Sequence, residues 1–200
     1  VVGVGREDGK TAGEYAPIFF KQAKYTLLDQ NTFWLCEKPD SVGMVGWDAA
    51  LTRIATWVKL QDKKTGQILM VVNTHFDHIG TEARRNSALL IIEKIKEIVG
   101  TSPAILTGDF NVSEDWDAYK TITNNEFILK DAHKVAGKRT GVDFTYHNFG
   151  KIPAEKCEKI DFIFVTPQIR VISSYIPFSQ LNDTLFLSDH NPEIVELEIK

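Results

Sequence analysis

Short apolar runs recur along the chain, and several of them end in polar side chains. Runs of this kind predict buried strands that stop at a surface. An acid, an amide or an imidazole stands at one end of four such runs: Asn73-Thr74-His75 follows residues 68–72, Gly108-Asp109-Phe110-Asn111 follows residues 103–106, Asp161 lies at the start of residues 160–165, and Ser188-Asp189-His190 follows residues 186–187. We predict that these strand ends meet in one shared site.

The rest of the pattern predicts further strands and two helices. Apolar residues recur at helical spacing between residues 82 and 99, and Gly100 and Pro103 end that helix. A shorter helix is expected at residues 113–122. We expect strands at residues 16–20, 25–35, 51–60, 171–175 and 193–199, a hairpin turn at residues 63–66, and loops at residues 3–15, 37–48 and 131–158. This mixture suits a single layered α/β domain over residues 1–200.

Composition limits the functions that the chain can have. The formal net charge of −4 excludes a protein that coats nucleic acid through a generally basic surface. A phosphate-handling enzyme stays open, because a metal ion and a few Arg or Lys side chains supply positive charge locally. Cys36 and Cys157 do not make a disulfide scaffold, although one bridge could form.

No stretch is long and apolar enough for a transmembrane helix, and no signal peptide is visible. The chain opens at Val1 without an initiator Met, and we therefore expect further chain upstream. The sequence assigns no cellular location and no obligate protein partner.

The polar strand ends carry groups suited to the hydrolysis of phosphate esters. If the strands are neighbours, Asp161 can hydrogen-bond one ring nitrogen of His190, so that the other nitrogen accepts a proton from water. Asp109 and Asn111, two apart on a strand, would point to the same side and place that water against phosphorus. His75 could hydrogen-bond a phosphate oxygen on which charge builds up. Carboxylates of this kind suit Mg²⁺ or Mn²⁺ more than zinc.

Arg53 lies inside the apolar run 51–60, where a charged side chain is costly without an anionic partner. A structural ion pair and a contact with substrate phosphate both meet this requirement, and the sequence leaves both open.

His75-Phe76-Asp77-His78 permits a second interpretation, because it is similar to the second half of the His-x-His-x-Asp-His zinc cluster of metallo-β-lactamase-like hydrolases. That cluster needs a histidine where this chain has Asn73, and a further histidine that is absent between His78 and Asp109. Zinc prefers several nitrogen or sulfur ligands. Because these ligands are missing, a zinc hydrolase that uses His75, Asp77 and His78 is kept only as the alternative function.

In their order along the chain, the motifs resemble those of the endonuclease/exonuclease/phosphatase superfamily, which has the deoxyribonuclease I-like fold. The loop Gly5-Arg6…Gly13-Glu14-Tyr15 and Arg53 also resemble parts of that family, so the resemblance runs from about Gly3 to the C-terminus. The most specific pieces are Asn73-Thr74-His75, Gly108-Asp109-Phe110-Asn111, Ile160-Asp161-Phe162-Ile163 and Ser188-Asp189-His190-Asn191-Pro192.

The resemblance implies a four-layer α-β-β-α sandwich of two mainly antiparallel sheets flanked by helices. It also implies a divalent-metal-dependent hydrolase of phosphate esters, acting on nucleic acid, a nucleotide or another small phosphodiester. In this assignment, His190 is the general base and Asp161 orients it. Asp109 and Asn111 position the nucleophile and the phosphate, and His75, paired with Glu14, stabilises or protonates phosphate oxygens.

The resemblance further implies that Arg53 contacts or braces the phosphate site and that Asp189 and Asp109 help to bind Mg²⁺ or Mn²⁺. The family's first strand carries an Asn, and a following strand carries the Glu that is its main metal ligand. This chain has neither, so we expect both upstream of Val1, in the first strands and helix of the domain.

Substrate choice is predicted to lie in the loops at residues 37–48 and 131–158. Nearby aromatic residues could stack on a base or sugar, or serve only the core; these are Trp47, Trp116, Phe144, Tyr146 and Phe149. A catalytically silent binding module is a third interpretation. Such modules usually lose the base, its orienter or the Asp/Asn pair, and this chain keeps them all.

Overall fold

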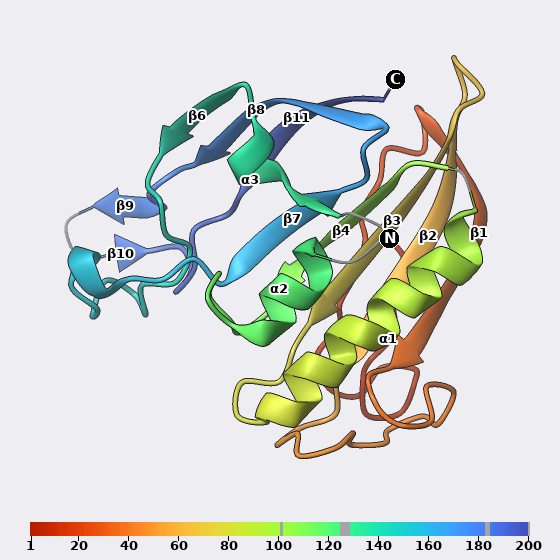
Figure 1. Cartoon of the computed structure of the whole chain (residues 1–200), viewed down its shortest axis with the longest axis horizontal. Coiled ribbons are helices and arrows are strands. Elements are labelled where there is room, and N and C mark those ends of the chain that lie inside the picture. Colours follow the sequence, from red (N-terminus) through yellow and green to blue (C-terminus); the bar gives the residue numbers. More distant parts are fainter. Residues whose placement is uncertain (101, 125–128, 183–184, 200) are drawn as a thin grey trace.

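A six-stranded mixed sheet forms the centre of the computed structural model, which describes residues 1–100, 102–124, 129–182 and 185–199 (Figure 1). The strand order is β1-β2-β3-β4-β7-β5, and only the neighbours β3 and β4 run parallel. The strands are β1 (Tyr25–Trp34), β2 (Ile54–Asp62), β3 (Ile68–His75), β4 (Ala104–Asp109), β5 (Lys130–Asp131) and β7 (Asp161–Val165).

Helices α1 (Thr81–Val99) and α2 (Asp117–Thr123) lie on one face of this sheet (Figure 1). The helical spacing of the apolar residues buries Ile91 and Ile95 against strand residues such as Leu106 and Phe162. The carboxylate of Asp48 caps the start of α1, because it accepts hydrogen bonds from the backbone N–H groups of residues 82 and 83.

A smaller sheet of order β11-β8-β6 packs against the other face of the larger sheet. Its strands are β6 (Lys138–Gly141), β8 (Ile169–Ile176) and β11 (Ile194–Ile199). Leu69 and Val165 of the larger sheet share one hydrophobic cluster with Val171 and Leu197 of the smaller one. Two short helices and a separate two-stranded sheet complete the described part: α3 (Ala132–Val135), η1 (Ala154–Lys156), β9 (Gln180–Asn182) and β10 (Leu185–Phe186).

The predicted α/β sandwich of two sheets with helices is confirmed. The larger sheet is mainly antiparallel, as expected, whereas the smaller one has one antiparallel pair, β8–β11, and one parallel pair, β6–β8. The strand predicted at residues 16–20 is wrong, since only a single bridge joins Val2 and Ile18. Pro17 has no N–H for a ladder, and its carbonyl accepts a hydrogen bond from the side chain of Asn73. The segment 131–158 is more ordered than expected, because it contains α3, β6 and η1.

Two predicted boundaries also move. Strand β2 begins at Ile54, because the N–H of Leu51 is bonded to the Asp77 carboxylate instead of to a strand. Helix α2 begins at Asp117, because Ser113 and Asp115 hydrogen-bond to each other in a preceding turn.

Two expectations from composition can be compared with the described residues. Both cysteines are free, so the optional bridge between Cys36 and Cys157 is not formed. Within the described ranges, no helix has the length and apolar character needed to cross a bilayer.

Candidate active site

Three neighbouring strands place acid and imidazole side chains in a row. In the parallel pair β3–β4, His75 lies opposite Asp109, and in the antiparallel pair β4–β7, Asp109 lies opposite Asp161. His75 Nε2 is 3.4 Å from Asp109 Oδ2. The sheet register therefore brings together residues that are far apart in the sequence.

His190 completes this row from the chain segment before β11. Its Nδ1 lies 2.7 Å from Asp161 Oδ2, and its Nε2 lies 4.0 Å from Asp109 Oδ2. The ring of Tyr146 packs against the imidazole, with 5.0 Å between ring centroids. With Asp161 on Nδ1, the other ring nitrogen faces the space beside Asp109 and is suited to accept a proton.

The surroundings shift the pKa values of these groups in different directions. Burial, reinforced by the charge of Asp161, raises the pKa of Asp109 to about 6. Burial opposes the charge of His190, but the hydrogen bond and negative charge of Asp161 outweigh it and raise the His190 pKa. Burial and the positive charge of Arg53 lower the pKa of His75, which is therefore a neutral hydrogen-bond donor or acceptor at pH 7.

Asn111 lies at the site, but for a different reason from the one predicted. Strand β4 ends at Asp109, so the two side chains do not share a strand face. The backbone N–H of Asn111 donates to Asp109 Oδ1 at 2.9 Å, and Asn111 has a left-handed φ of 49°. Its side-chain nitrogen donates to the carbonyl of Phe76 at 3.0 Å, which ties the loops after β3 and β4 together.

The N-terminal loop reaches the site through Glu14. Glu14 Oε2 lies 3.8 Å from Nδ1 of His75 and is also ion-paired with Arg6. The predicted pairing of Glu14 with His75 is therefore present as a close contact. Arg6 is a site neighbour that the sequence argument did not assign, although its motif was noted.

Arg53 is held by a structural ion pair. Its side chain is 4% exposed, and Nε lies 3.4 Å from Asp77 Oδ2. Nη2 lies 3.1 Å from His78 Nδ1. Its Nη1 is buried and has no hydrogen-bond partner among the described residues. Of the two roles left open for Arg53, the ion pair is present in the structure, and a phosphate contact stays a prediction.

The zinc alternative is contradicted by the surroundings of Asp77. The Asp77 carboxylate accepts hydrogen bonds from the N–H groups of Leu51, Ile79 and Gly80. These bonds hold its pKa below the usual range despite burial, which opposes the charge. Because this carboxylate is already bonded to the loop and to Arg53, it does not join His75 and His78 in a metal site.

A different cluster has the composition of a cation site. One ligand atom each from Asp109, Asp161 and His190 lies within 4.8 Å of the others. Asp109 was predicted as a ligand, whereas Asp189 lies outside this cluster and its role as a ligand stays a prediction. Oxygen donors fit Mg²⁺ or Mn²⁺, and the raised pKa of Asp109 indicates negative charge that a cation would compensate.

Two residues that the sequence argument missed support Asp161. The hydroxyl of Thr145 accepts hydrogen bonds from the N–H groups of Ile160 and Asp161, both at 3.0 Å. Lys159 Nζ donates to the carbonyl of Asp161 at 2.8 Å. Thr145 and Lys159 stand in a polar loop and at a strand start, and no local pattern distinguishes them from ordinary surface residues.

The predicted aromatic residues have separate positions. Tyr146 contacts His190, and Phe144 packs with His147 and Phe178. Phe149 is 49% exposed with a left-handed φ of 54°. Trp47 lies beside residues 89, 90, 93 and 94 of α1, and Trp116 lies at the start of α2. Tyr146 therefore packs against the catalytic row, which consists of His75, Asp109, Asp161 and His190.

The fold and the row of His75, Asp109, Asp161 and His190 define a two-sheet α/β sandwich protein with an acid–histidine site at the strand ends. The model of the Endonuclease/Exonuclease/phosphatase family matches residues 15–190. The chain belongs to this family.

The chain is also similar to solved structures and to one curated protein. An endonuclease/exonuclease/phosphatase from Bacteroides vulgatus is 65% identical, with a TM-score of 0.96 over 100% of this chain and 76% of that chain. A mannosyl-6-phosphatase from Bacteroides thetaiotaomicron is 37% identical, with a TM-score of 0.91 over 99% of this chain and 76% of its own. An uncharacterised protein of Acanthamoeba polyphaga mimivirus is 30% identical over 82% of this chain, which spans only 63% of that relative.

Proposed function

We propose that the chain carries a divalent-metal-dependent phosphoesterase activity and that its substrate is a phosphate monoester of a sugar. The observation that carries the proposal is the 2.7 Å contact between His190 and Asp161, beside Asp109. Catalytically silent modules usually lose the base, its orienter or the Asp/Asn pair. All of them are present and adjacent, which favours an enzyme.

Water activation is assigned to His190. Asp161 accepts the Nδ1 hydrogen and favours the imidazolium that forms, so Nε2 is free to take a proton from water. Asp109 lies 4.0 Å from Nε2, and a water between the two groups would be oriented by both. As this water attacks phosphorus, its proton moves to Nε2 and the bond from phosphorus to the alcohol oxygen breaks. The departing oxygen takes a proton from solvent.

We assign to His75 and Asn111 the stabilisation of the negative charge that develops on the phosphate oxygens. The lowered pKa of His75 keeps it neutral, so a ring N–H can donate without fixing a permanent charge at the site. Glu14 lies 3.8 Å from Nδ1, beyond hydrogen-bond distance, which leaves the single N–H of the neutral ring available at Nε2. Donors that are held in place before the reaction stabilise developing negative charge without reorganisation.

Asp109 would hold Mg²⁺ or Mn²⁺, with the remaining oxygen ligands coming from water and phosphate, a common arrangement for Mg²⁺ in proteins. When bound, the ion supplies positive charge to the phosphate oxygens. Asp161 is committed to His190, and we therefore assign it to orientation of the base.

Two observations support a sugar phosphate over nucleic acid. The mannosyl-6-phosphatase is 37% identical over 99% of this chain, which makes its substrate class a reasonable model for this protein. The net charge of −4 disfavours binding of a polynucleotide, because its phosphate backbone is bound best by a positively charged surface. We also propose that residues 1–200 belong to one domain, because the site draws on residues from Glu14 to His190.

The test measures phosphate release from mannose 6-phosphate and glucose 6-phosphate, and nitrophenol release from the diester bis-p-nitrophenyl phosphate. Each assay is run with Mg²⁺, Mn²⁺ or EDTA. We expect metal-dependent release from a sugar phosphate, with loss of activity in His190→Ala. Asp143→Asn is the control, because this side chain is 99% exposed and outside the site. Activity on the diester alone would refute the sugar phosphate, and silence on all substrates would favour the binding module.

A further inference from the structure

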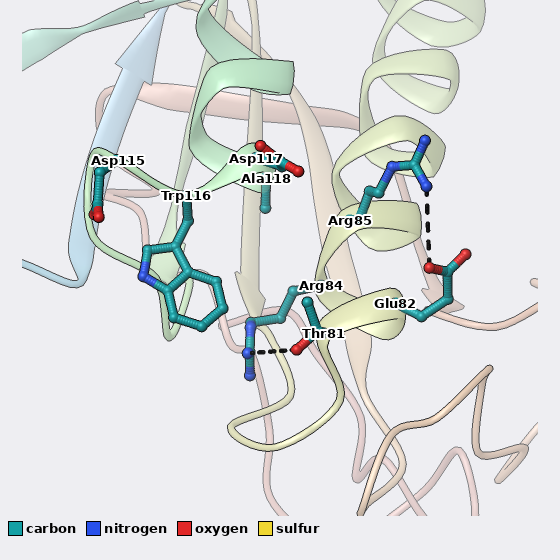
Figure 2. Close-up of a pocket in the computed structure, with 8 residues that line it drawn as sticks. All are labelled: Thr81, Glu82, Arg84, Arg85, Asp115, Trp116, Asp117 and Ala118. Atoms are coloured by element: carbon teal, nitrogen blue, oxygen red, sulfur yellow. Dashed lines mark hydrogen bonds and ion pairs between the residues drawn. The ribbon is translucent and has the colours of Figure 1, made fainter.

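A second pocket lies on the helical side of the larger sheet, where the start of α1 faces the start of α2 (Figure 2). It has a volume of about 450 Å³. Its lining comes from the first turn of α1 and from the segment that enters α2: Thr81, Glu82, Arg84, Arg85, Asp115, Trp116, Asp117 and Ala118. None of these residues belongs to the catalytic row.

Arg84 packs against Trp116, which is the aromatic residue among those that line this pocket. The Arg84 guanidinium lies over the ring of Trp116, 4.8 Å from the ring centroid, while Trp116 itself is 40% exposed (Figure 2). Arg84 is only 4% exposed, and it donates to the carbonyl of Asp77 at 3.0 Å. A buried cation against one part of the indole holds the ring in place and leaves the exposed part available to a ligand.

One donor of this bracing arginine is unused. Arg84 Nε is buried and has no hydrogen-bond partner within the described residues. Its other contacts are a backbone carbonyl and, at 3.5 Å, the hydroxyl of Thr81. A buried donor without a partner costs free energy, so the arginine is not fully satisfied by the contacts that it makes within the described residues.

The rim of the pocket is polar and carries both signs of charge. Asp115, Asp117 and Glu82 supply carboxylates, and Arg85 lies 4.0 Å from Glu82 as an exposed ion pair. An exposed indole surrounded by carboxylates and guanidinium groups suits a ring with an apolar C–H face and several hydroxyls, because the face stacks and the hydroxyls hydrogen-bond. Three carboxylates against two arginines disfavour a polynucleotide backbone.

The pocket is also close enough to the catalytic row for one extended ligand to reach both. Trp116 follows Asn111 by five residues, and five residues span at most roughly 18 Å when fully extended. Arg84 and Asn111 both bond to the loop after β3, through the carbonyls of Asp77 and Phe76.

We propose that this pocket binds a neutral sugar unit of a glycan whose phosphorylated sugar occupies the site of His190. The proposal rests on the assigned sugar-phosphate hydrolysis and narrows its substrate from a free sugar phosphate to a phosphorylated oligosaccharide. Trp116 provides the stacking surface, Arg84 positions Trp116, and the carboxylates of Asp115 and Asp117 accept hydrogen bonds from hydroxyls.

Binding of unphosphorylated glycans tests the pocket without using the catalytic site. Calorimetry is performed with neutral trisaccharides (mannotriose, maltotriose and cellotriose) and with a short single-stranded oligonucleotide. We expect one trisaccharide to bind wild type and Trp116→Phe, and the affinity of Trp116→Ala to fall about tenfold, the size of one aromatic stack. Tyr175→Ala is the matched control, because Tyr175 is a 44% exposed aromatic residue on the smaller sheet.

Kinetics with phosphorylated mannotriose and mannose 6-phosphate test the connection to catalysis. We expect a KM about tenfold lower for the trisaccharide, and loss of this advantage in Trp116→Ala and Asp117→Ala with kcat for mannose 6-phosphate unchanged. Equal KM values in wild type, an advantage that survives both substitutions, or Trp116-dependent binding of the oligonucleotide alone would overturn the proposal. Trp116-dependent binding of a trisaccharide without hydrolysis of any phosphate ester would support the pocket and refute the assigned activity.

Discussion

Asp77 and Asp109 both lie near the ends of neighbouring strands, β3 and β4. The two carboxylates differ in how many groups of the protein bond to them. Asp77 accepts hydrogen bonds from the N–H groups of Leu51, Ile79 and Gly80 and is ion-paired with Arg53. Asp109 accepts one backbone N–H bond, from Asn111, and lies in a row with Asp161 and two histidines.

The pKa values record this difference. The pKa of Asp77 lies below the usual range, despite burial, whereas burial and Asp161 raise the pKa of Asp109 to about 6. A carboxylate whose bonds are satisfied by the protein stabilises the fold, and one held near other acids stores unfavourable charge that a cation or proton relieves. Asp77 of the apparent zinc motif therefore stabilises the fold, whereas Asp109 of the Gly-Asp-Phe-Asn motif is suited to the candidate active site.

The largest expected effect is on catalysis, from His190→Ala. Removal of a positioned general base lowers a rate by about a hundredfold to ten thousandfold. We expect kcat for the sugar phosphate to fall by about a thousandfold. His78→Gln is the matched control, since His78 contacts Arg53 and not the row, and it should keep most of the activity. Equal losses in both variants would contradict the separation of the two regions.

Next in size is the destabilisation expected from Asp77→Ala. The substitution leaves Arg53 as a buried cation without its carboxylate and frees three backbone N–H groups. Breaking a buried pair in this way costs about 3–5 kcal/mol. Urea unfolding followed by circular dichroism measures the loss, with Asp143→Ala as an exposed control. A change below about 0.5 kcal/mol would place Asp77 among ordinary surface residues.

Asp109→Asn should change stability in the opposite direction. Because the folded pKa of about 6 exceeds the unfolded value near 3.8, Asp109 lowers stability progressively as pH rises from about 4 to about 6. In EDTA at pH 7 we expect the variant to be about 2 kcal/mol more stable than wild type, and equally stable at pH 3. A lower stability of the variant at pH 7 would show that the Asp109 charge is compensated by the protein.

The substitution Asp161→Asn tests whether His190 is the general base, and its expected effect is the smallest of the four. Asp161 raises the pKa of His190, and activity needs neutral His190, so the wild-type rate falls as pH drops through that raised value. Without the carboxylate, the acid limb of the kcat profile should move to lower pH, with a lower maximum rate. An unchanged acid limb would assign it to another group.

Several features of this protein follow from the sequence. The apolar runs and the helical spacing at residues 82–99 are local patterns, and they predicted β1, β3, β4, β7, β8, β11 and α1 with small shifts at their ends. Local signals failed where distant partners decide the structure. Ala16 to Phe20 is apolar but has only one bridge, because its neighbour Val2 lies in a loop, and Leu51 is drawn away from β2 by Asp77.

The candidate site divides in the same way. The sequence determined which groups are available: a base, carboxylates and an amide at strand ends, each detectable from a motif of a few residues. Tertiary structure alone decided that Asp109 faces His75 and Asp161, that Asp77 is bonded to Arg53, and that Thr145 supports Asp161. It also brought Arg84 against Trp116. The physical reason is that sheet register and helix packing fix distances between residues that are remote in the chain, and those distances set burial, charge and hydrogen bonding.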